Sequence, residues 1–265
     1  MRCLTQDLRD LRLTGMPEAL DAWHAIPANA DRGADACLAF LLDAHRQAVS
    51  QSRSDGFFRR AGLATHFSVQ TFTAGQASGL TPQRLDHLKG LSWIDRGQTI
   101  VISGPTRSGK THLAAGLGQE AMVQGIRTTF IQTPRMLERC LDPDDAVGSR
   151  RYLRQLSAIP LLVMDDFATE QASTERTYLL RRLLDERSRR GLPTVVASIN
   201  PPGDWDDYFE DPAAREGIYA RLLGGECHRV ELKRRADLVA THSVRRSTPS
   251  NGTRKKASSK EAVAS

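Results

Sequence analysis

The chain has 265 residues, of which 40% are apolar and 26% are charged, a composition typical of a soluble globular protein with a sizeable core. No apolar run approaches the roughly 20 residues that a membrane-spanning helix needs, and the N-terminus shows no cleavable apolar segment, so neither a membrane span nor a signal peptide is predicted. The net charge is +6, but residues 241–265 hold six bases and one acid, so the other 31 bases and 30 acids give only +1.

Because the rest of the chain is nearly neutral, overall basicity says little about whether the folded part binds nucleic acid. The four cysteines, at positions 3, 37, 140 and 227, are too far apart in the sequence to indicate a metal knuckle or a redox pair. Free thiols are typical of a reducing compartment, so we expect a cytoplasmic protein without a membrane partner.

Residues 1–60 are predicted to form two or three short helices. Leucines fall near helical spacing before Gly15 and Pro17 interrupt the pattern, and a second apolar face follows. The first set is Leu4, Leu8, Leu11 and Leu13, and the second is Leu38, Leu41, Leu42 and Ala48.

Residues 61–96 are predicted to be a connector that packs on the main domain. The segment is rich in glycine, threonine and serine, and large apolar side chains lie in it and just before it. These side chains are Phe57, Phe58, Leu63, Phe67 and Phe72.

From residue 97 onward, predicted strands alternate with predicted helices. The strands are Thr99–Ser103, Arg127–Ile131, Leu161–Met164, Thr194–Ile199 and Arg229–Leu232. The helices are Thr111–Gln124, Met136–Leu141, a helix that Ser173 caps and that runs to Arg190, and Pro212–Leu223. This alternation predicts an α/β domain over residues 97–235, with a parallel sheet covered on both faces. Residues 241–265, rich in Ser, Thr, Lys and Arg, are predicted to be a disordered basic tail.

A phosphate-binding loop is the strongest signal in the sequence. Gly104–Thr111 matches G-x-x-x-x-G-K-[ST] and lies between a predicted strand and a predicted helix. The loop's N–H groups and the helix N-terminus attract phosphate, Lys110 reaches the β- and γ-phosphates, and the Thr111 hydroxyl ligates Mg²⁺. The predicted nucleotide-binding residues here are Gly104, Pro105, Thr106, Arg107, Ser108, Gly109, Lys110, Thr111 and His112.

Two adjacent acids supply the second half of the predicted site. Asp165 and Asp166 end the apolar run Leu161–Met164, and ligands of a doubly wound sheet bind at the carboxyl ends of its strands. Asp165 is predicted to hold magnesium through water. Asp166 is predicted to orient the attacking water.

Two further residues have open alternatives. Asn200, after the fourth strand, places a polar group near the γ-phosphate or forms a turn with the Pro201-Pro202-Gly203 that follows. Arg221 either reaches the nucleotide of a neighbouring subunit, where it stabilises charge on the γ-phosphate, or makes a local ion pair.

With these pieces in order, the chain resembles the IstB-like transposition helper ATPases, AAA+ proteins related to the DnaC helicase loaders and DnaA initiators. The resemblance covers about residues 4–235. The matching stretches are Leu11–Met16, Trp93–Gly97, Gly104–Leu113, Leu161–Phe167, Thr194–Trp205, Asp211-Pro212, Ile218, Arg221-Leu222 and His228–Lys233. Arg107 stands where family members usually have glycine or a small residue, and Ile199 where a sensor Asn or Gln is usual. Asp166 stands where most AAA+ ATPases have Glu, although the Asp-Asp pair is usual for this subfamily. Because only a short segment follows the last predicted strand, we expect no helical lid with a second sensor arginine.

The resemblance implies an ATPase that binds ATP and Mg²⁺, forms a homo-oligomer on double-stranded DNA and assists a transposase, with N-terminal helices that choose the partner. Arg150, Arg151 and Arg154 lie within about one helical turn, in the segment where this clade lines a DNA channel. A solvated face balanced by nearby acids is the alternative for these arginines. The alternatives for the whole chain are a DnaC-like loader of a replicative helicase and a DNA scaffold that binds ATP but hardly hydrolyses it.

Overall fold

A computed structural model describes residues 4–63, 67–73 and 79–233. The expected tail, residues 241–265, lies outside the described residues. The helices are α1 (Leu4–Asp10), α2 (Met16–His24), α3 (Ala34–Ala61), α4 (Pro82–Lys89), α5 (Ser92–Asp95), α6 (Lys110–Val123), α7 (Thr133–Cys140), α8 (Ala146–Ala158), α9 (Thr174–Arg189) and α10 (Pro212–Leu222). The strands are β1 (Thr99–Ser103), β2 (Thr128–Gln132), β3 (Leu161–Phe167), β4 (Thr194–Ser198) and β5 (Cys227–Glu231), and three short 3₁₀ turns are Pro27–Asn29, Pro202–Asp204 and Asp206–Tyr208.

The five strands form one parallel sheet in the order β2-β3-β4-β1-β5, which confirms the predicted α/β fold. Because side chains alternate along each strand, each face of the sheet has its own core. Ile100, Ile102 and Val163 face α3, α4 and α6, whereas Val101 and Met164 face α7 to α10. The order brings the carboxyl ends of β1 and β3 to the same edge, with β4 between them.

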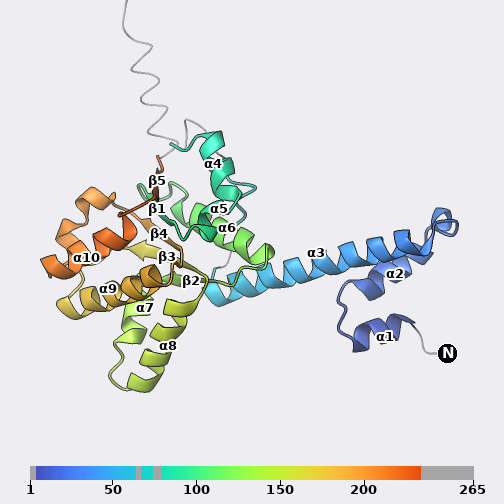
Figure 1. Ribbon diagram of the computed structural model, residues 1–265, viewed down its shortest axis with the longest axis horizontal. Coiled ribbons are helices and arrows are strands. Elements are labelled where there is room, and N and C mark those ends of the chain that lie inside the picture. The colour runs from blue at the N-terminus through green and yellow to red at the C-terminus, as the bar shows by residue number, and fades with distance from the viewer. Residues whose placement is uncertain (1–3, 64–66, 74–78, 234–265) are drawn as a thin grey trace, which may run out of the picture.

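The segment between α3 and β1 packs into the first of these cores (Figure 1). It contains two helices, α4 and α5, that the sequence analysis did not predict. Thr81 caps α4 by accepting a hydrogen bond from the backbone N–H of Arg84, and Trp93 in α5 is fully buried and donates its indole N–H to the carbonyl of Leu88 at 2.9 Å. These helices cover the sheet on the side of β1.

α3 is a single helix that extends from the α/β domain to α1 and α2 (Figure 1). A small cluster formed by Met16, Ala19, Leu20 and Leu41 joins it to α2. The two predicted apolar faces were only partly correct. Leu11 lies beyond the end of α1 and is 70% exposed, and Leu38 is 54% exposed, since so small a unit has too few neighbours to cover both faces. None of the helices in the described part of the chain is long and apolar enough to cross a membrane.

Candidate functional site

The loop between β1 and α6 has the backbone shape of a phosphate-binding loop. Gly104 and Gly109 have φ values of 147° and 97°, and α6 begins at Lys110. Gly104 also passes close to β5, since a Cβ atom there would lie 2.3 Å from the carbonyl oxygen of Leu232. Any other residue at 104 would therefore push β5 away from the loop.

Two polar groups in this loop fit an anionic ligand. The Lys110 Nζ donates to the carbonyl of Pro105 at 3.0 Å, so the ammonium group lies over the loop. Burial lowers the pKa of Lys110, whereas Asp165 and Asp166 raise it. The Ser108 hydroxyl oxygen is buried and has no hydrogen-bond partner among the described residues. A phosphate oxygen could accept from the unpaired Ser108 hydroxyl and from the remaining N–H groups of the Lys110 ammonium.

Thr111 and Asp165 join the loop to the end of β3. The Thr111 hydroxyl donates to Asp165 Oδ2 at 2.9 Å, across 54 residues of sequence. Asp165 is 4% exposed, and burial raises the pKa of its carboxyl group while the bond from Thr111 lowers it. Hydroxyl and carboxylate oxygens suit Mg²⁺, which takes its remaining ligands from phosphates and water. The Thr111 hydroxyl and the Asp165 carboxylate fit that pattern, since both offer oxygen atoms beside the phosphate-binding loop.

Asp166 lies in an irregular part of β3. The register between β3 and β4 shifts between Met164 and Phe167, and Asp166 has a φ of 51°. Left-handed backbone costs a non-glycine residue about 1 kcal/mol, and such strain gathers at functional sites. The bulge turns Asp166 toward a small pocket that Thr133, Ala168 and Thr169 also line, whereas Asp165 stays buried beside Thr111.

The family model described as IstB-like ATP binding protein matches residues 6–243. The chain belongs to that family. A protein of Mycobacterium tuberculosis named for ATP binding in an insertion sequence is 29% identical over 83% of this chain and 88% of its own length. The ATP-binding protein named for the insertion sequence IS21 of Pseudomonas aeruginosa is 28% identical over 70% of this chain and 73% of its own.

Solved structures show the same fold. DnaI, at 16% identity, has a TM-score of 0.54 over 63% of this chain and 90% of that chain. A DNA replication initiation factor, also at 16% identity, has a TM-score of 0.53. The match covers 68% of this chain and about half (54%) of that protein. These likenesses place the IstB-like chain in the AAA+ fold of initiators and loaders.

Arg107, where the resemblance leads us to expect glycine or a small residue, has a left-handed backbone with a φ of 65°. Glycine adopts this conformation without steric cost. The side chain is exposed. Arg107 therefore adds a cation to the rim of the loop and strains the backbone at the same position.

The free energy of unfolding of the Arg107→Gly variant is expected to exceed that of the Arg107→Ala variant by roughly 0.5 to 1 kcal/mol, because only glycine relieves the left-handed strain. Both changes remove the same charge, so a difference in stability between the two variants reports backbone strain and not the loss of charge. Denaturant unfolding measures the difference. Equal stabilities for the two variants would show that residue 107 is not strained.

His112 faces aromatic side chains from the connector. Its Nε2 lies 3.1 Å from the carbonyl oxygen of Ser68, and its ring centroid lies 5.2 Å from that of Phe67 and 5.4 Å from that of Phe72. A Cβ atom at Gly109 would lie 3.2 Å from the Phe72 ring. A nucleotide-binding role for His112 stays a prediction. The positions of Phe67 and Phe72 beside the loop were not predicted, because their apolar side chains indicate only that they pack on the domain.

Asn200 lies after the end of β4 and turns toward the 3₁₀ turn at Asp206–Tyr208. Its side-chain amide donates to the Tyr208 hydroxyl, and its carbonyl accepts from the Trp205 indole at 3.0 Å. β4 ends at Ser198, which pairs with Ser103 without any slip between β1 and β4. The structure therefore shows the turn that was one of the two alternatives for Asn200, and the sensor role stays a prediction.

Arg221 makes the local ion pair that was one of its two alternatives. Its Nε lies 2.6 Å from Asp185 Oδ1 of α9, and its Nη1 donates to the carbonyl of Gly217 at 3.3 Å. Its side chain is 35% exposed. The arginine thus lies at the surface of the domain, held by α9, and its action on a neighbouring subunit stays a prediction.

Arg150 and Arg154 line one groove between α8 and α9, whereas Arg151 does not. The groove measures about 620 Å³ and also contains Arg182, Arg190 and Glu186. Glu186 pairs with Arg190 and Arg189, and no ion pair joins Arg150, Arg154 or Arg182 to an acid within the part of the chain that the structure describes. The groove therefore carries uncompensated positive charge on both of its walls, and Arg182 is a contributor that sequence reasoning missed.

Proposed function

We propose that this chain is a Mg²⁺-dependent ATPase that assembles as a homo-oligomer on double-stranded DNA and assists a transposase. The observation that carries the proposal is the hydrogen bond from Thr111 to Asp165, because it brings the phosphate-binding loop and the acid of β3 into one site. A loop that merely connects a strand to a helix has no need of such a partner.

Each residue of the site has its own role in phosphoryl transfer. The loop from Gly104 to Thr111 binds the triphosphate, and Lys110 neutralises its β- and γ-phosphates. Thr111 and Asp165 would hold Mg²⁺, which when bound offsets the charge that develops on the phosphates. Asp166 orients the attacking water, and Arg221 of an adjacent copy stabilises charge on the γ-phosphate.

Two observations support the transposase as partner. The relatives with the highest similarity reported above are named for insertion sequences. The N-terminal unit also exposes large apolar side chains that a partner protein would cover. These are Leu4, Leu11, Ile26, Leu38, Phe40 and Leu42, out of nine exposed large hydrophobic residues among the described ones.

The groove between α8 and α9 supports double-stranded DNA as the second ligand. Arg150 and Arg154 from one wall and Arg182 from the other present guanidinium groups that bind phosphates without reading sequence. Arg151 does not line this groove, so its predicted contact with DNA would use another surface.

Phosphate release with and without duplex DNA tests this function. Duplex DNA is expected to stimulate release by the unmodified chain, and the double replacement Arg150→Ala and Arg154→Ala is expected to weaken DNA binding by roughly 10- to 100-fold and to reduce its salt dependence. Replacing Arg59 and Arg60 of α3 with alanine removes the same charge elsewhere and serves as the control. Binding of ATP without release under either condition would favour the scaffold instead.

A further inference from the structure

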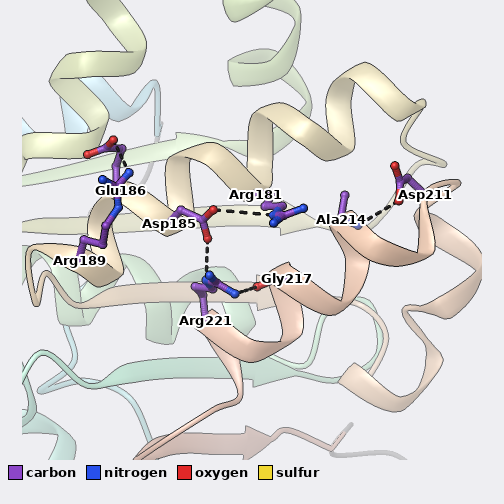
Figure 2. A network of polar contacts seen from close by, with 8 residues as sticks. All are labelled: Arg181, Asp185, Glu186, Arg189, Asp211, Ala214, Gly217 and Arg221. Atoms are coloured by element: carbon purple, nitrogen blue, oxygen red, sulfur yellow. Dashed lines mark hydrogen bonds and ion pairs between the residues drawn. The ribbon is translucent and has the colours of Figure 1, made fainter.

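An ion-pair cluster at the contact between α9 and α10 surrounds Asp185. One carboxylate oxygen lies 2.6 Å from Arg221 Nε, and the other lies 3.7 Å from Arg181 Nε, one helical turn back along α9. Figure 2 shows the carboxylate between the two guanidinium groups, with Arg221 also bonded to the carbonyl of Gly217. Two cations share one anion, so the cluster keeps a positive charge.

The packing of the two helices fixes the positions of these groups. Leu184 of α9 and Leu222 of α10, next to Asp185 and Arg221 in the sequence, are buried in the same core. A Cβ atom at Gly217 would lie 2.9 Å from Arg181 Nε, so glycine leaves the space in which the Arg181 side chain reaches Asp185. Asp185 itself is only 25% exposed. The Asp185 carboxylate thus has one ion-pair partner on its own helix and a second, Arg221, on α10.

The contacts of Arg221 engage the inner part of its guanidinium group. Nε lies 2.6 Å from Asp185 Oδ1 in an ion pair, although Oδ1 accepts no hydrogen bond from the described residues. Nη1 donates to the carbonyl of Gly217, and no described residue forms a hydrogen bond or ion pair with Nη2. A planar guanidinium group with an ion pair at Nε and a hydrogen bond at Nη1 has little freedom to rotate, so the N–H groups of its outer edge keep a restricted direction. Such an arrangement orients an arginine toward a further anion rather than neutralising it.

We propose that Asp185 is the positioning residue that orients Arg221 toward the γ-phosphate of a nucleotide in an adjacent copy of the chain. The inference rests on the proposed function, since it requires Arg221 to act between subunits. The local ion pair and the action on a neighbouring subunit are then compatible, because the ion pair with Asp185 sets the direction in which Arg221 points. Preorganised charge of this kind acts in the transition state and hardly affects binding of the substrate.

Full-length Asp185→Asn and Arg221→Ala variants test the proposal through phosphate release in the presence of duplex DNA. Asp185→Asn is expected to lower kcat roughly 10- to 100-fold while the affinity for ATP stays unchanged, because a misdirected catalytic group costs turnover and not binding. Asp185→Glu is expected to recover part of the loss. Glu216→Gln removes the same charge from an exposed position on α10 and serves as the control.

Mixed assemblies separate positioning from a merely structural role. Asp185→Asn subunits keep an intact phosphate-binding loop, and Lys110→Ala subunits keep an intact Asp185–Arg221 pair, so the mixture is expected to release more phosphate than the two separate samples together. A mixture of Asp185→Asn with Arg221→Ala is expected to show no such recovery, because neither subunit supplies an oriented arginine. Equal recovery in both mixtures would overturn the proposal.

The single variants show which assignment fails. If Arg221→Ala loses turnover but Asp185→Asn keeps it, the positioning role is wrong and the function of Arg221 stands. If Arg221→Ala keeps full turnover, the action of Arg221 between subunits is wrong, and the positioning role falls with it. If the unmodified chain binds ATP but releases no phosphate, the ATPase activity itself is wrong, and both assignments fall.

Discussion

Replacing Lys110 with alanine is expected to abolish ATP binding, with a loss of affinity of at least about 100-fold, or roughly 2.7 kcal/mol. The ammonium group lies over the loop, 3.0 Å from the carbonyl of Pro105, and is partly buried beside Asp165 and Asp166. Removing it takes away the charge-assisted bond to the phosphates and leaves two carboxylates that repel them. Both effects act in the same direction, so the loss exceeds that of an ordinary hydrogen bond.

Titration of the full-length chain with a fluorescent ATP analogue measures this loss. Lys89→Ala, which removes a lysine from α4 of the same domain, is the matched control and is expected to keep its affinity. Circular dichroism checks that both variants are folded. Unchanged nucleotide affinity in Lys110→Ala would show that Gly104–Thr111 is not the triphosphate site.

The parts of the fold that the sequence predicted are those with local signals. The three central strands, β3, β4 and β1, are short and largely apolar runs, and the loop at Gly104–Thr111 has a fixed spacing of glycines and lysine. Adjacency of Thr111 and Asp165 also followed, because parallel strands bring their carboxyl ends to one edge. Local signals did not predict which side chains share a surface. Arg150 and Arg154 line one groove, and Arg151 does not line it.

The features that could not be predicted depend on distant partners. The pairing of Asp185 with Arg221 joins residues of two helices, and neither sequence neighbourhood indicates the other. α4 did have a signal in Thr81 before Pro82, a capping residue followed by proline at the first turn, which the loop-like composition around it obscured. Arg187 also had a signal, since it follows Leu180, Leu183 and Leu184 at helical spacing on the buried face of α9.

Arg187 is 1% exposed and joins three segments of the domain. Its guanidinium group donates to the carbonyls of Leu156 and Ile159 at 2.8 Å each, at the end of α8, and to the Thr194 hydroxyl at 3.0 Å, at the start of β4. It also donates to the carbonyl of Pro193. Burial lowers the pKa of Arg187 to about 9, which is still well above neutral pH, so the group is charged under ordinary conditions.

Replacing Arg187 with leucine is expected to lower the free energy of unfolding by about 3 kcal/mol. The change leaves several buried carbonyl groups without a donor, and each unsatisfied group costs roughly 1 to 3 kcal/mol. Relief from burying an unpaired charge offsets part of that cost, which is why the expected total is smaller than the sum. The loss is large for a domain whose whole stability is about 5 to 15 kcal/mol.

Denaturant unfolding of the full-length chain measures the effect, and Arg189→Leu is the matched control. Arg189 lies two residues further along the same helix, but its side chain is 70% exposed and pairs with Glu186 at the surface. Its replacement is therefore expected to change stability by less than about 0.5 kcal/mol. Because Arg187 ties the end of α8 to α9, the leucine variant is also expected to bind DNA more weakly through the groove between those helices. Equal free energies of unfolding for the two leucine variants would show that the hydrogen bonds of Arg187 to the end of α8 do not stabilise the domain.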